Sequence, residues 1–421
     1  MDRPRHLRRA LAGGEFDSGK RGRVDNPLTI SWPSIGSEDV VWDVQPRAGM
    51  TRRERAMIGR TYRAAITAPI ADLDPILSAQ SLAAADEAAA ALARFDEQMG
   101  HRLAPYAAIL LRSEAASSSR IEGISSGARA VMEAEVTGGG RGNAAEVYAN
   151  TLAMRAALDC ADGVTDDSIR MMHRHLLGTA APDIAGHWRD EQVWIGADNS
   201  PQTADFVPPA PQRVPAALAD LFAYTEREDW PVVAQVAVAH AQFETIHPFT
   251  DGNGRVGRAL MHVMLRDKGV TRNAAVPVSS GLLVRQSSYV AALTSYRAGD
   301  PDAIVMEVSR ACLEAAEHGR NLVEATAAIR QRWAHEMRSV RADSAAHRLA
   351  DGLIGQPVVT VKEVREILGT KDNVHRHIDT LVARGVLVPG QDYRTRNLTW
   401  RAPDVLDALD NYSEAVGRRS H

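Results

Sequence analysis

The stretch ETIHPFTDGNGRVGRAL, residues 244–260, places one histidine, one aspartate, a Gly-Asn-Gly triplet and two arginines within twelve residues. The apolar run before it has the periodicity of a buried helix. Pro248 disfavours helical backbone in the residue before it, so this helix is predicted to end at His247. A loop follows, and a second helix is predicted from about Arg255 until Gly269.

The loop between the two helices has the composition of an anion cradle. Gly252, Asn253 and Gly254 can turn successive backbone N–H groups toward one point. The N-terminus of the second helix lies directly behind them and adds the positive end of its dipole. Arg255 and Arg258 are three residues apart, so they share a helix face and can reach the same anion.

Two further side chains suit phosphate chemistry. Asp251 lies at the mouth of the cradle, where its carboxylate can hold a Mg²⁺ ion that bridges phosphate oxygens. His247 lies at the opposite lip, where it can accept a proton. A structural His-Pro and a simple Gly-Asn-Gly turn are the alternative, but two arginines in a first helical turn oppose the dipole and argue against it. The set predicts phosphoryl or nucleotidyl transfer.

The segment HPFTDGNGRVGR, residues 247–258, resembles the signature of the Fic (Fic/Doc) family, His-x-Phe-x-(Asp/Glu)-Gly-Asn-Gly-Arg-x-x-Arg, at every specified position. Residues 186–207 resemble the β-hairpin flap of that family. The resemblance extends from Leu28 to about Gly319. It implies a self-inhibited protein AMP-transferase (AMPylator), which moves AMP from ATP onto a Ser, Thr or Tyr hydroxyl of a protein and releases pyrophosphate.

The resemblance also implies a role for each residue of the motif. His247 is expected to be the general base that deprotonates the target hydroxyl, and Asp251 is expected to hold Mg²⁺. Phe249 is expected to anchor the loop in the core, and the flap to bind the target backbone by β-augmentation. The residues expected to bind the phosphates of ATP, with help from the asparagine side chain, are Gly252, Asn253, Gly254, Arg255 and Arg258.

A second motif, SSSRIEGISSG at residues 117–127, concerns regulation. Ser118 and Glu122 lie on one helix face, and Gly123 follows. This resembles the inhibitory motif of the Fic family, (Ser/Thr)-x-x-x-Glu-(Gly/Asn). It implies that the Glu122 carboxylate pairs with Arg258 and excludes the γ-phosphate. The alternative is a solvated glutamate near a helix end; the matching motif downstream favours inhibition.

The periodicity of the chain predicts a mainly α fold with four parts. These are a mobile tail (1–27), an N-terminal helical region with the inhibitory helix (28–140), a Fic core (141–345) and a winged-helix domain (346–421). Turn-rich residues 186–207 break the helical pattern and predict a β-hairpin. The predicted helices are Gln80–Gln98, Pro105–Ser118, Ala144–Asp159, Asp166–Leu177, Val214–Arg227, Val232–Ile246 and Arg255–Lys268.

The C-terminal part carries its own pattern. A capping box joins Thr360 to Glu363, and a helix, a turn, a second helix and an apolar hairpin follow, which predicts a winged helix. Residues 357–401 contain eight Lys or Arg and five Asp or Glu, a net charge of +3. DNA contact and protein contact therefore both remain open. The candidate DNA contacts are Lys371, Arg376, Arg394 and Arg396.

Composition sets outer limits. The 421 residues carry a net charge of −4, which gives no general attraction to nucleic acid or membrane. Cys160 and Cys312 match no metal spacing and are interpreted as reduced thiols of a cytosolic protein. No apolar run is long enough to span a bilayer, and the basic N-terminus lacks the apolar core of a secretory signal, so a cytoplasmic location is expected.

Several alternatives remain open at this point. The same site could remove AMP or transfer a different nucleotidyl or phosphoryl group, or the chain could be a DNA-binding regulator that uses the Fic site as a sensor. Auto-modification and a homodimer are also compatible with the sequence. His173 is interpreted as a surface or hydrogen-bonded histidine, and Tyr289 as lining the adenine side of the cleft or as core.

Overall fold

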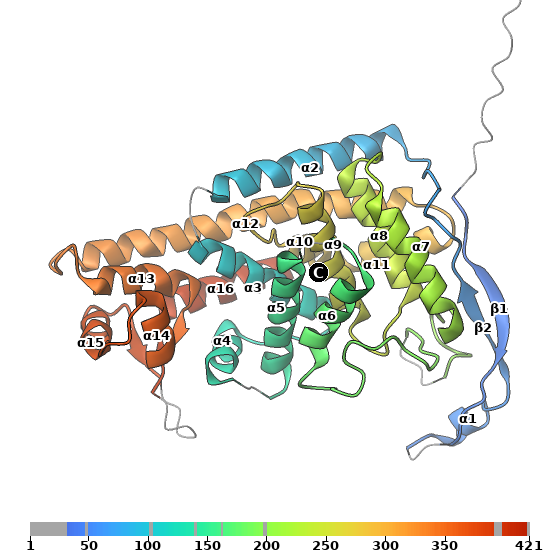
Figure 1. Cartoon of the computed structure of the whole chain (residues 1–421), viewed down its shortest axis with the longest axis horizontal. Helices are drawn as coiled ribbons and strands as arrows, with labels where there is room; N and C mark the ends of the chain where they lie inside the picture. Colours follow the sequence, from blue (N-terminus) through green and yellow to red (C-terminus); the bar gives the residue numbers. More distant parts are fainter. Residues whose placement is uncertain are drawn as a thin grey trace, which may run out of the picture. The chain divides into compact units, whose positions relative to one another are not determined.

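Helices built from Ala-rich amphipathic stretches dominate the chain (Figure 1). The computed structural model describes residues 32–46, 49–100, 104–138, 141–160, 163–196, 200–390 and 398–418; the predicted tail lies outside them. The part from Trp32 onward forms one unit. Its α-helices up to the loop of interest and just beyond it are α1 (Arg52–Arg55), α2 (Ala79–Gly100), α3 (Ala104–Ile121), α4 (Ala128–Thr137), α5 (Asn143–Asp159), α6 (Asp166–Leu177), α7 (Val214–Glu226), α8 (Val232–Ile246) and α9 (Asn253–Asp267). The seven predicted helices are present with ends within a few residues of the prediction.

Helices α8 and α9 lie at the centre and contact each other directly. Every residue of α8 from Val233 to Ile246 is buried, which explains why its sequence carries almost no charge. Helix α8 also contacts α2, α7, α11 (Gln286–Arg297) and α12 (Asp302–Glu336). The loop that joins α8 to α9 is therefore held on a rigid base.

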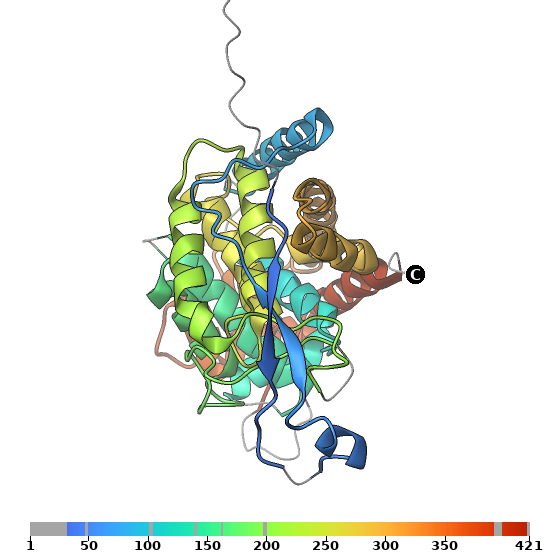
Figure 2. The same cartoon turned by 90° about the vertical axis from the view of Figure 1, so that its right-hand side faces the viewer.

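An unpredicted hairpin precedes the first long helix. Strand β1 (Gly36–Val41) pairs antiparallel with β2 (Thr61–Ile66), and the short helix α1 lies in the connection between them (Figure 2). The N-terminal region is thus helical from Ala79, as predicted, but begins with strands. The alternating exposed and buried residues of β2 are the sequence signal for this strand.

The predicted flap hairpin is reduced, in its described residues, to one bridge. Ile195 and Phe206 exchange both backbone hydrogen bonds, at 2.8 and 3.2 Å. The β1–β2 hairpin supports this flap, since Ala65 N donates to Val207 O at 3.0 Å. Trp42 of the hairpin also meets Trp194 of the flap edge-on. A separate apolar cluster therefore joins hairpin and flap.

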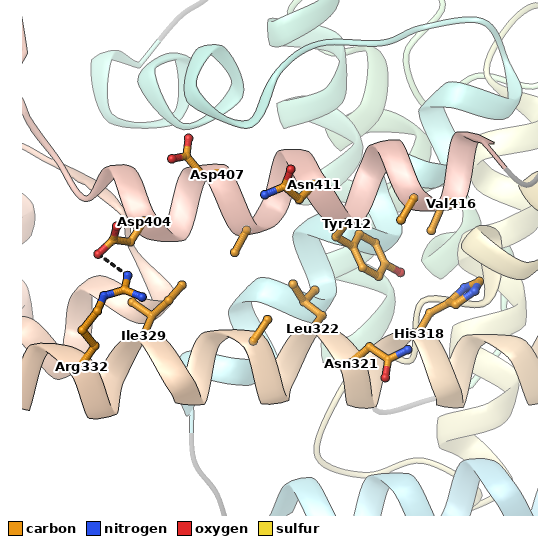
Figure 3. Close-up of a pocket in the computed structure, with 13 residues that line it drawn as sticks. His318, Asn321, Leu322, Ile329, Arg332, Asp404, Asp407, Asn411, Tyr412 and Val416 are labelled. Atoms are coloured by element: carbon orange, nitrogen blue, oxygen red, sulfur yellow. Dashed lines mark ion pairs between the residues drawn. The ribbon is translucent and has the colours of Figure 1, made fainter.

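Helix α12 is 35 residues long and connects the core to the C-terminal part. It packs along α2 and α10 (Val278–Val284) and, further on, along α16 (Pro403–Arg418). Figure 3 shows α12 and α16 side by side, joined by an ion pair of 2.7 Å between Arg332 and Asp404. A groove of about 510 Å³ lies between the two helices.

The C-terminal part follows the order helix, strand, helix, helix, strand, strand, helix. Its sheet has the antiparallel order β3-β5-β4. The predicted capping box of Thr360 and Glu363 is present at the start of α14. The elements before α16 are α13 (Ala345–Gly355), β3 (Val358–Val359), α14 (Val361–Leu368), α15 (His375–Ala383), β4 (Val388–Pro389) and β5 (Trp400–Arg401). Within the described residues, no helix combines the length and apolarity that crossing a membrane requires.

Candidate active site

His247 caps the C-terminus of α8 in a left-handed conformation, with φ 50° and ψ 61°. Among the described residues it is the one non-glycine position with a positive φ. Such a conformation is strained for a residue with a Cβ, and it persists only where the surroundings enforce it. Here Pro248 blocks continuation of the helix, as predicted.

Hydrogen bonds from Arg189 help to hold His247 in this conformation. Its buried guanidinium donates to His247 O at 2.8 Å and to Pro209 O at 2.5 Å, and its backbone N–H donates to Pro248 O at 3.0 Å. Burial lowers the pKa of Arg189 to about 10, so it stays charged at neutral pH. This side chain joins the base of the flap to the loop that carries His247.

The Asn253 side chain closes the loop. Its Oδ1 accepts from Phe249 N at 2.8 Å, and its Nδ2 donates to Phe249 O at 2.9 Å. Both polar atoms of this side chain thus hold the loop, and the help with phosphate binding expected from it stays a prediction. Gly252 precedes it with φ 77°, which suits glycine, and α9 begins at Asn253.

His173 supports the loop from below. Its ring stacks on Phe249 with centroids 3.7 Å apart, and Phe249 is fully buried, as expected of the loop anchor. Gly186 N donates to Nδ1 at 2.8 Å, so the ring proton is on Nε2, which donates to Asp251 O at 3.0 Å. Burial lowers the pKa of His173 to about 4 and keeps the ring neutral. Of the two alternatives for this histidine, the hydrogen-bonded one is correct.

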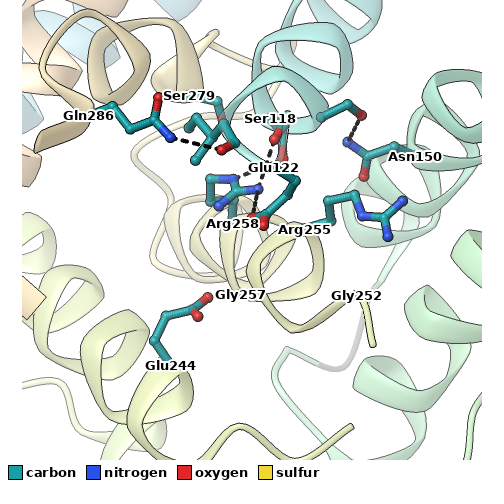
Figure 4. Close-up of polar contacts among 12 residues, drawn as sticks. Ser118, Glu122, Asn150, Glu244, Gly252, Arg255, Gly257, Arg258, Ser279 and Gln286 are labelled. Atoms are coloured by element: carbon teal, nitrogen blue, oxygen red, sulfur yellow. Dashed lines mark hydrogen bonds and ion pairs between the residues drawn. The ribbon is translucent and has the colours of Figure 1, made fainter. Parts of the chain in front are cut away.

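Arg258 lies fully buried between α9 and α3 (Figure 4), with 2% of its side chain exposed. Its Nε donates to Ser118 Oγ at 2.9 Å, and its Nη2 donates to Ser118 O at 2.8 Å. The same Nη2 donates to Glu122 Oε1 at 2.8 Å. Ser118 and Glu122, chosen from sequence for their spacing, thus meet the predicted arginine.

The Glu122 carboxylate lies over the start of α9. A Cβ added to Gly254 would collide with Glu122 Oε1, so the carboxylate stands directly above the helix N-terminus. Burial opposes the charge of Glu122, but the attraction and hydrogen bond of Arg258 outweigh it and lower the pKa of this carboxyl. An anionic group therefore already occupies the cradle predicted for an anion. Gly123 follows with φ 75° and turns the chain away.

Arg255 points from α9 toward α5 and is also buried. Its Nη1 lies 3.7 Å from Glu146 Oε2, and its Nη2 lies 3.7 Å from Asp251 Oδ1. Its Nε and Nη1 have no hydrogen-bond partner among the described residues. A buried guanidinium with unpaired N–H groups beside a helix N-terminus is suited to an oxyanion.

Asp251 stands at the edge of the loop with 67% of its side chain exposed. Its Oδ1 accepts from Gly252 N at 2.6 Å, which leaves the other oxygen directed outward. In the part of the chain that the structure describes, no three His, Cys, Asp or Glu side chains gather into a metal site. One exposed carboxylate fits Mg²⁺, because that ion is usually held by one or two carboxylates together with substrate phosphates and water.

Glu244, the first residue of the 244–260 stretch, is a buried neighbour of His247 that the sequence pattern did not single out. Its Oε2 lies 3.9 Å from His247 Nδ1, and its Oε1 has no hydrogen-bond partner among the described residues. Burial raises the pKa of Glu244 to about 7. Burial, reinforced by the charges of Arg189 and Arg297, lowers the pKa of His247 to about 4, so the imidazole is neutral at physiological pH.

The candidate DNA contacts belong to a different part of the molecule. Lys371 lies in the α14–α15 turn, and Arg376 is exposed on α15. Arg394 and Arg396 lie outside the described residues. Tyr289 is core: it is buried on α11, and its hydroxyl is 2.8 Å from His240 Nε2.

Sequence patterns could not single out Arg189, His173 or Glu244. Arg189 and His173 act through contacts with residues distant in sequence, and the properties of Glu244 come from its burial. Arg189 does carry a weak signal, an arginine at the start of a predicted hairpin. His173 lies on the buried face of α6, and the sequence left open whether it is a surface or a hydrogen-bonded histidine.

Comparison with known proteins agrees with this geometry. Residues 163–265 match the Fic/DOC family, and residues 82–159 match the Fic/DOC family N-terminal region. Protein adenylyltransferase fic-1 of Caenorhabditis briggsae is 36% identical over 109 residues, which are 25% of this chain and 20% of that protein. Probable protein adenylyltransferase aq_aa38 of Aquifex aeolicus (strain VF5) is 28% identical over 218 residues, 48% of this chain and 61% of that protein. The matches thus cover between a fifth and three fifths of these two relatives.

Among solved structures, a Fic family protein from Desulfovibrio desulfuricans G20 superimposes with a TM-score of 0.51 at 20% identity. The superposition covers 78% of this chain and 97% of that protein, and it supports the fold. With the loop geometry, the two matching regions identify residues 163–265 as a Fic/DOC family domain, preceded by the N-terminal region of that family at residues 82–159.

Proposed function

We propose that this protein transfers AMP from ATP to a hydroxyl group of a protein side chain. The observation that carries the proposal is the loop after α8, in which one strained turn brings a neutral histidine beside the N-terminus of α9 and the two buried arginines of that helix. The names of the two relatives, both protein adenylyltransferases, support the same activity.

In the proposed reaction, the target hydroxyl oxygen attacks the α-phosphorus of ATP. The bond from the α-phosphorus to the bridging oxygen breaks, and pyrophosphate leaves. His247 accepts the hydroxyl proton through Nε2, because its Nδ1 is buried toward Glu244. A general base of this kind contributes about 10²- to 10⁴-fold to the rate.

The arginines and the helix N-terminus supply electrostatic stabilisation. Arg255 and Arg258 would hold the outer phosphates, and the first backbone N–H groups of α9, from Asn253 and Gly254, would contact the others. Asp251 would hold Mg²⁺, which neutralises charge on the phosphates when bound. Because the pKa of His247 is lowered to about 4, its imidazole is already unprotonated at neutral pH and can accept a proton.

We further propose that the state described here is inhibited. Glu122 accepts a hydrogen bond from Nη2 of Arg258 and lies over Gly254, so a γ-phosphate would have to displace its carboxylate. If the open state has a population of about 1%, removing this carboxylate raises activity by up to about 100-fold. The limit follows because the open population cannot exceed one.

The test uses ATP labelled at the α-phosphate, incubated with the full-length protein and host lysate. Glu122→Gly is expected to label protein strongly, wild type weakly, and Glu122→Gly with His247→Ala not at all. Nucleotide binding should survive in the His247→Ala variant, because the base acts on the target hydroxyl. Label transfer by the His247→Ala double variant at the rate of Glu122→Gly would contradict the assigned role.

A DNA-binding role for residues 346–421 remains a second proposal. The order of α13, β3, α14, α15, β4 and β5, with the middle position of β5 in the sheet, supports a winged helix. Lys371 and Arg376 are placed on or next to the second helix of the helix-turn-helix pair.

The site after α8 could also remove AMP from a modified protein. Release of labelled AMP from a modified target would favour that activity.

A further inference from the structure

The C-terminal helix α16 contacts the same segment that carries Glu122. Helix α3 ends at Ile121, and α4 begins at Ala128, so residues 122–127 form the turn between them. Helix α16 packs against α3, α4, α10 and α12. Its contacts with α3 and α4 fall on either side of the turn.

The first contact holds the end of α3. Arg120 Nη1 donates to Ser413 O at 2.7 Å, and the Arg120 guanidinium lies against Gly417 so closely that a Cβ there would collide with it. Residues two apart on a helix point to nearly opposite sides. Arg120 therefore faces α16, while Glu122 faces Arg258 on α9. The end of the inhibitory helix is held between these two helices.

The second contact holds the start of α4. Gly127 is its N-cap residue and has no side chain to cap the helix. Asp410 of α16 performs that role: its Oδ1 accepts from Ala128 N at 2.8 Å. A cap supplied by a distant helix ties the order of this turn to the position of α16.

A third contact joins the middle of α3 to the C-terminal part. Arg112 donates to Gly355 O at 2.6 Å and to Gln356 Oε1 at 2.7 Å, at the C-terminal end of α13. Beyond the turn, α16 is anchored to α12 through Asp404, which accepts from Trp333 Nε1 at 2.8 Å and pairs with Arg332 (Figure 3). The helix also continues from β5, where Ala402 N donates to Pro357 O at 2.8 Å.

We infer that α16 is a latch that keeps Glu122 in the phosphate site, and that loss of its contacts with Arg120 and Ala128 activates the enzyme. This inference rests on the proposed inhibition by Glu122. With Arg120 and Asp410 engaged, the 122–127 turn is held from one side by α16 and from the other by Arg258. Gln286 Nε2 and Asn143 Nδ2 also donate to Ile121 O and Ser125 O, each at 2.9 Å. Loss of the α16 contacts therefore removes part of the restraint on the turn, and the population of the open state rises.

The experiment compares full-length variants by the initial rate of α-labelled AMP transfer into host lysate. Arg120→Ala and Asp410→Ala are each expected to raise the rate about 3- to 10-fold over wild type, since each removes one restraint on a two-state equilibrium. Asp410→Asn keeps the acceptor for Ala128 N and is expected to stay within about 2-fold of wild type. Asp407→Ala, exposed on α16 toward the groove side, is the matched control and should match wild type.

Combination with Glu122→Gly separates the two proposals. Adding Asp410→Ala to Glu122→Gly should give no further gain, because the latch acts through Glu122. If Glu122→Gly is active while Arg120→Ala and Asp410→Ala equal wild type, the latch is overturned and the inhibition stands. If Glu122→Gly gains nothing over wild type, the inhibition is overturned.

Amide hydrogen exchange gives a readout that does not depend on activity. In Asp410→Ala, the amides of residues 121–128 should exchange faster than in wild type, while those of α8 keep their rates. Reciprocity requires that opening of the turn also loosens α16. Unchanged exchange at residues 121–128 in both Asp410→Ala and Arg120→Ala would overturn the latch even with every variant folded.

Discussion

At the scale of single residues, the site depends on groups whose ionisation is set by burial. His247 has a lowered pKa and Glu244 a raised one, and the two side chains face each other at 3.9 Å. Both are therefore neutral over most of the range between pH 4 and pH 7. A neutral carboxyl beside a neutral imidazole avoids a buried charge in the resting state, which would be costly in an apolar surrounding.

Replacement of Glu244 by Gln should make the protein less sensitive to alkaline pH. In the unfolded chain this carboxyl loses its proton near pH 4.5, whereas in the folded protein burial raises its pKa to about 7. Its contribution to stability is thus full below pH 4.5 and is lost as pH rises through 7. The amide has no such dependence, so between pH 5 and pH 9 the stability of Glu244→Gln relative to wild type should improve by on the order of 3 kcal/mol.

Urea unfolding at several pH values measures this difference. Glu97→Gln makes the same chemical change on an exposed position of α2 and is the control. Parallel pH profiles for wild type and Glu244→Gln would show that the carboxyl ionises as freely in the fold as in the unfolded chain.

At the scale of elements, the β1–β2 hairpin supports the flap. Trp42 is 3% exposed and packs on Trp194, whereas its neighbour Val41 is 54% exposed. The flap itself holds only one described backbone bridge, between Ile195 and Phe206. The position of the flap therefore depends on the apolar cluster beneath it.

Truncation of Trp42 should impair use of the protein target while leaving nucleotide binding intact. Trp42→Ala opens a cavity, which commonly costs about 3–5 kcal/mol in a packed core. We expect kcat/KM for the target, measured in the Glu122→Gly background, to fall at least 10-fold. ATP affinity should change by less than about 2-fold. Val41→Ala is the matched control; an equal loss in both variants would contradict a specific role of the cluster.

At the scale of the whole molecule, one long helix and α16 connect the C-terminal part to the site. Helix α12 spans both regions, and the contacts of α16 reach Arg120 and Ala128. Residues 357–401 of the C-terminal part carry a net charge of +3, and Lys371 and Arg376 lie in their helix-turn-helix segment. DNA binding there and displacement of α16 would be linked in free energy if both occur.

Binding of duplex DNA should weaken with salt in proportion to the phosphates contacted. If Lys371 and Arg376 each contact one phosphate, Lys371→Ala with Arg376→Ala should lower the slope of log K against log salt by about 1.8. Fluorescence anisotropy with labelled duplexes at several salt concentrations measures the slope. Arg52→Ala with Arg53→Ala removes two exposed charges from α1 and is the control; identical slopes for both double variants would exclude these two contacts.

The sequence by itself determined the helices, the loop and the chemistry of the site, because these depend on neighbours in the chain. Pro248 ends α8 at His247, glycine permits the turn at Gly252, and the i, i+4 spacing puts Ser118 and Glu122 on one face. Residues far apart in sequence were beyond such patterns. Only the tertiary structure placed Arg189 on the carbonyl of His247, used the Asn253 side chain to close the loop and laid α16 across the end of α3. The contact of Arg189 joins residues 58 apart in sequence, and the contact between Arg120 and α16 joins residues 293 apart. Burial and chain topology, not local propensity, decide such contacts.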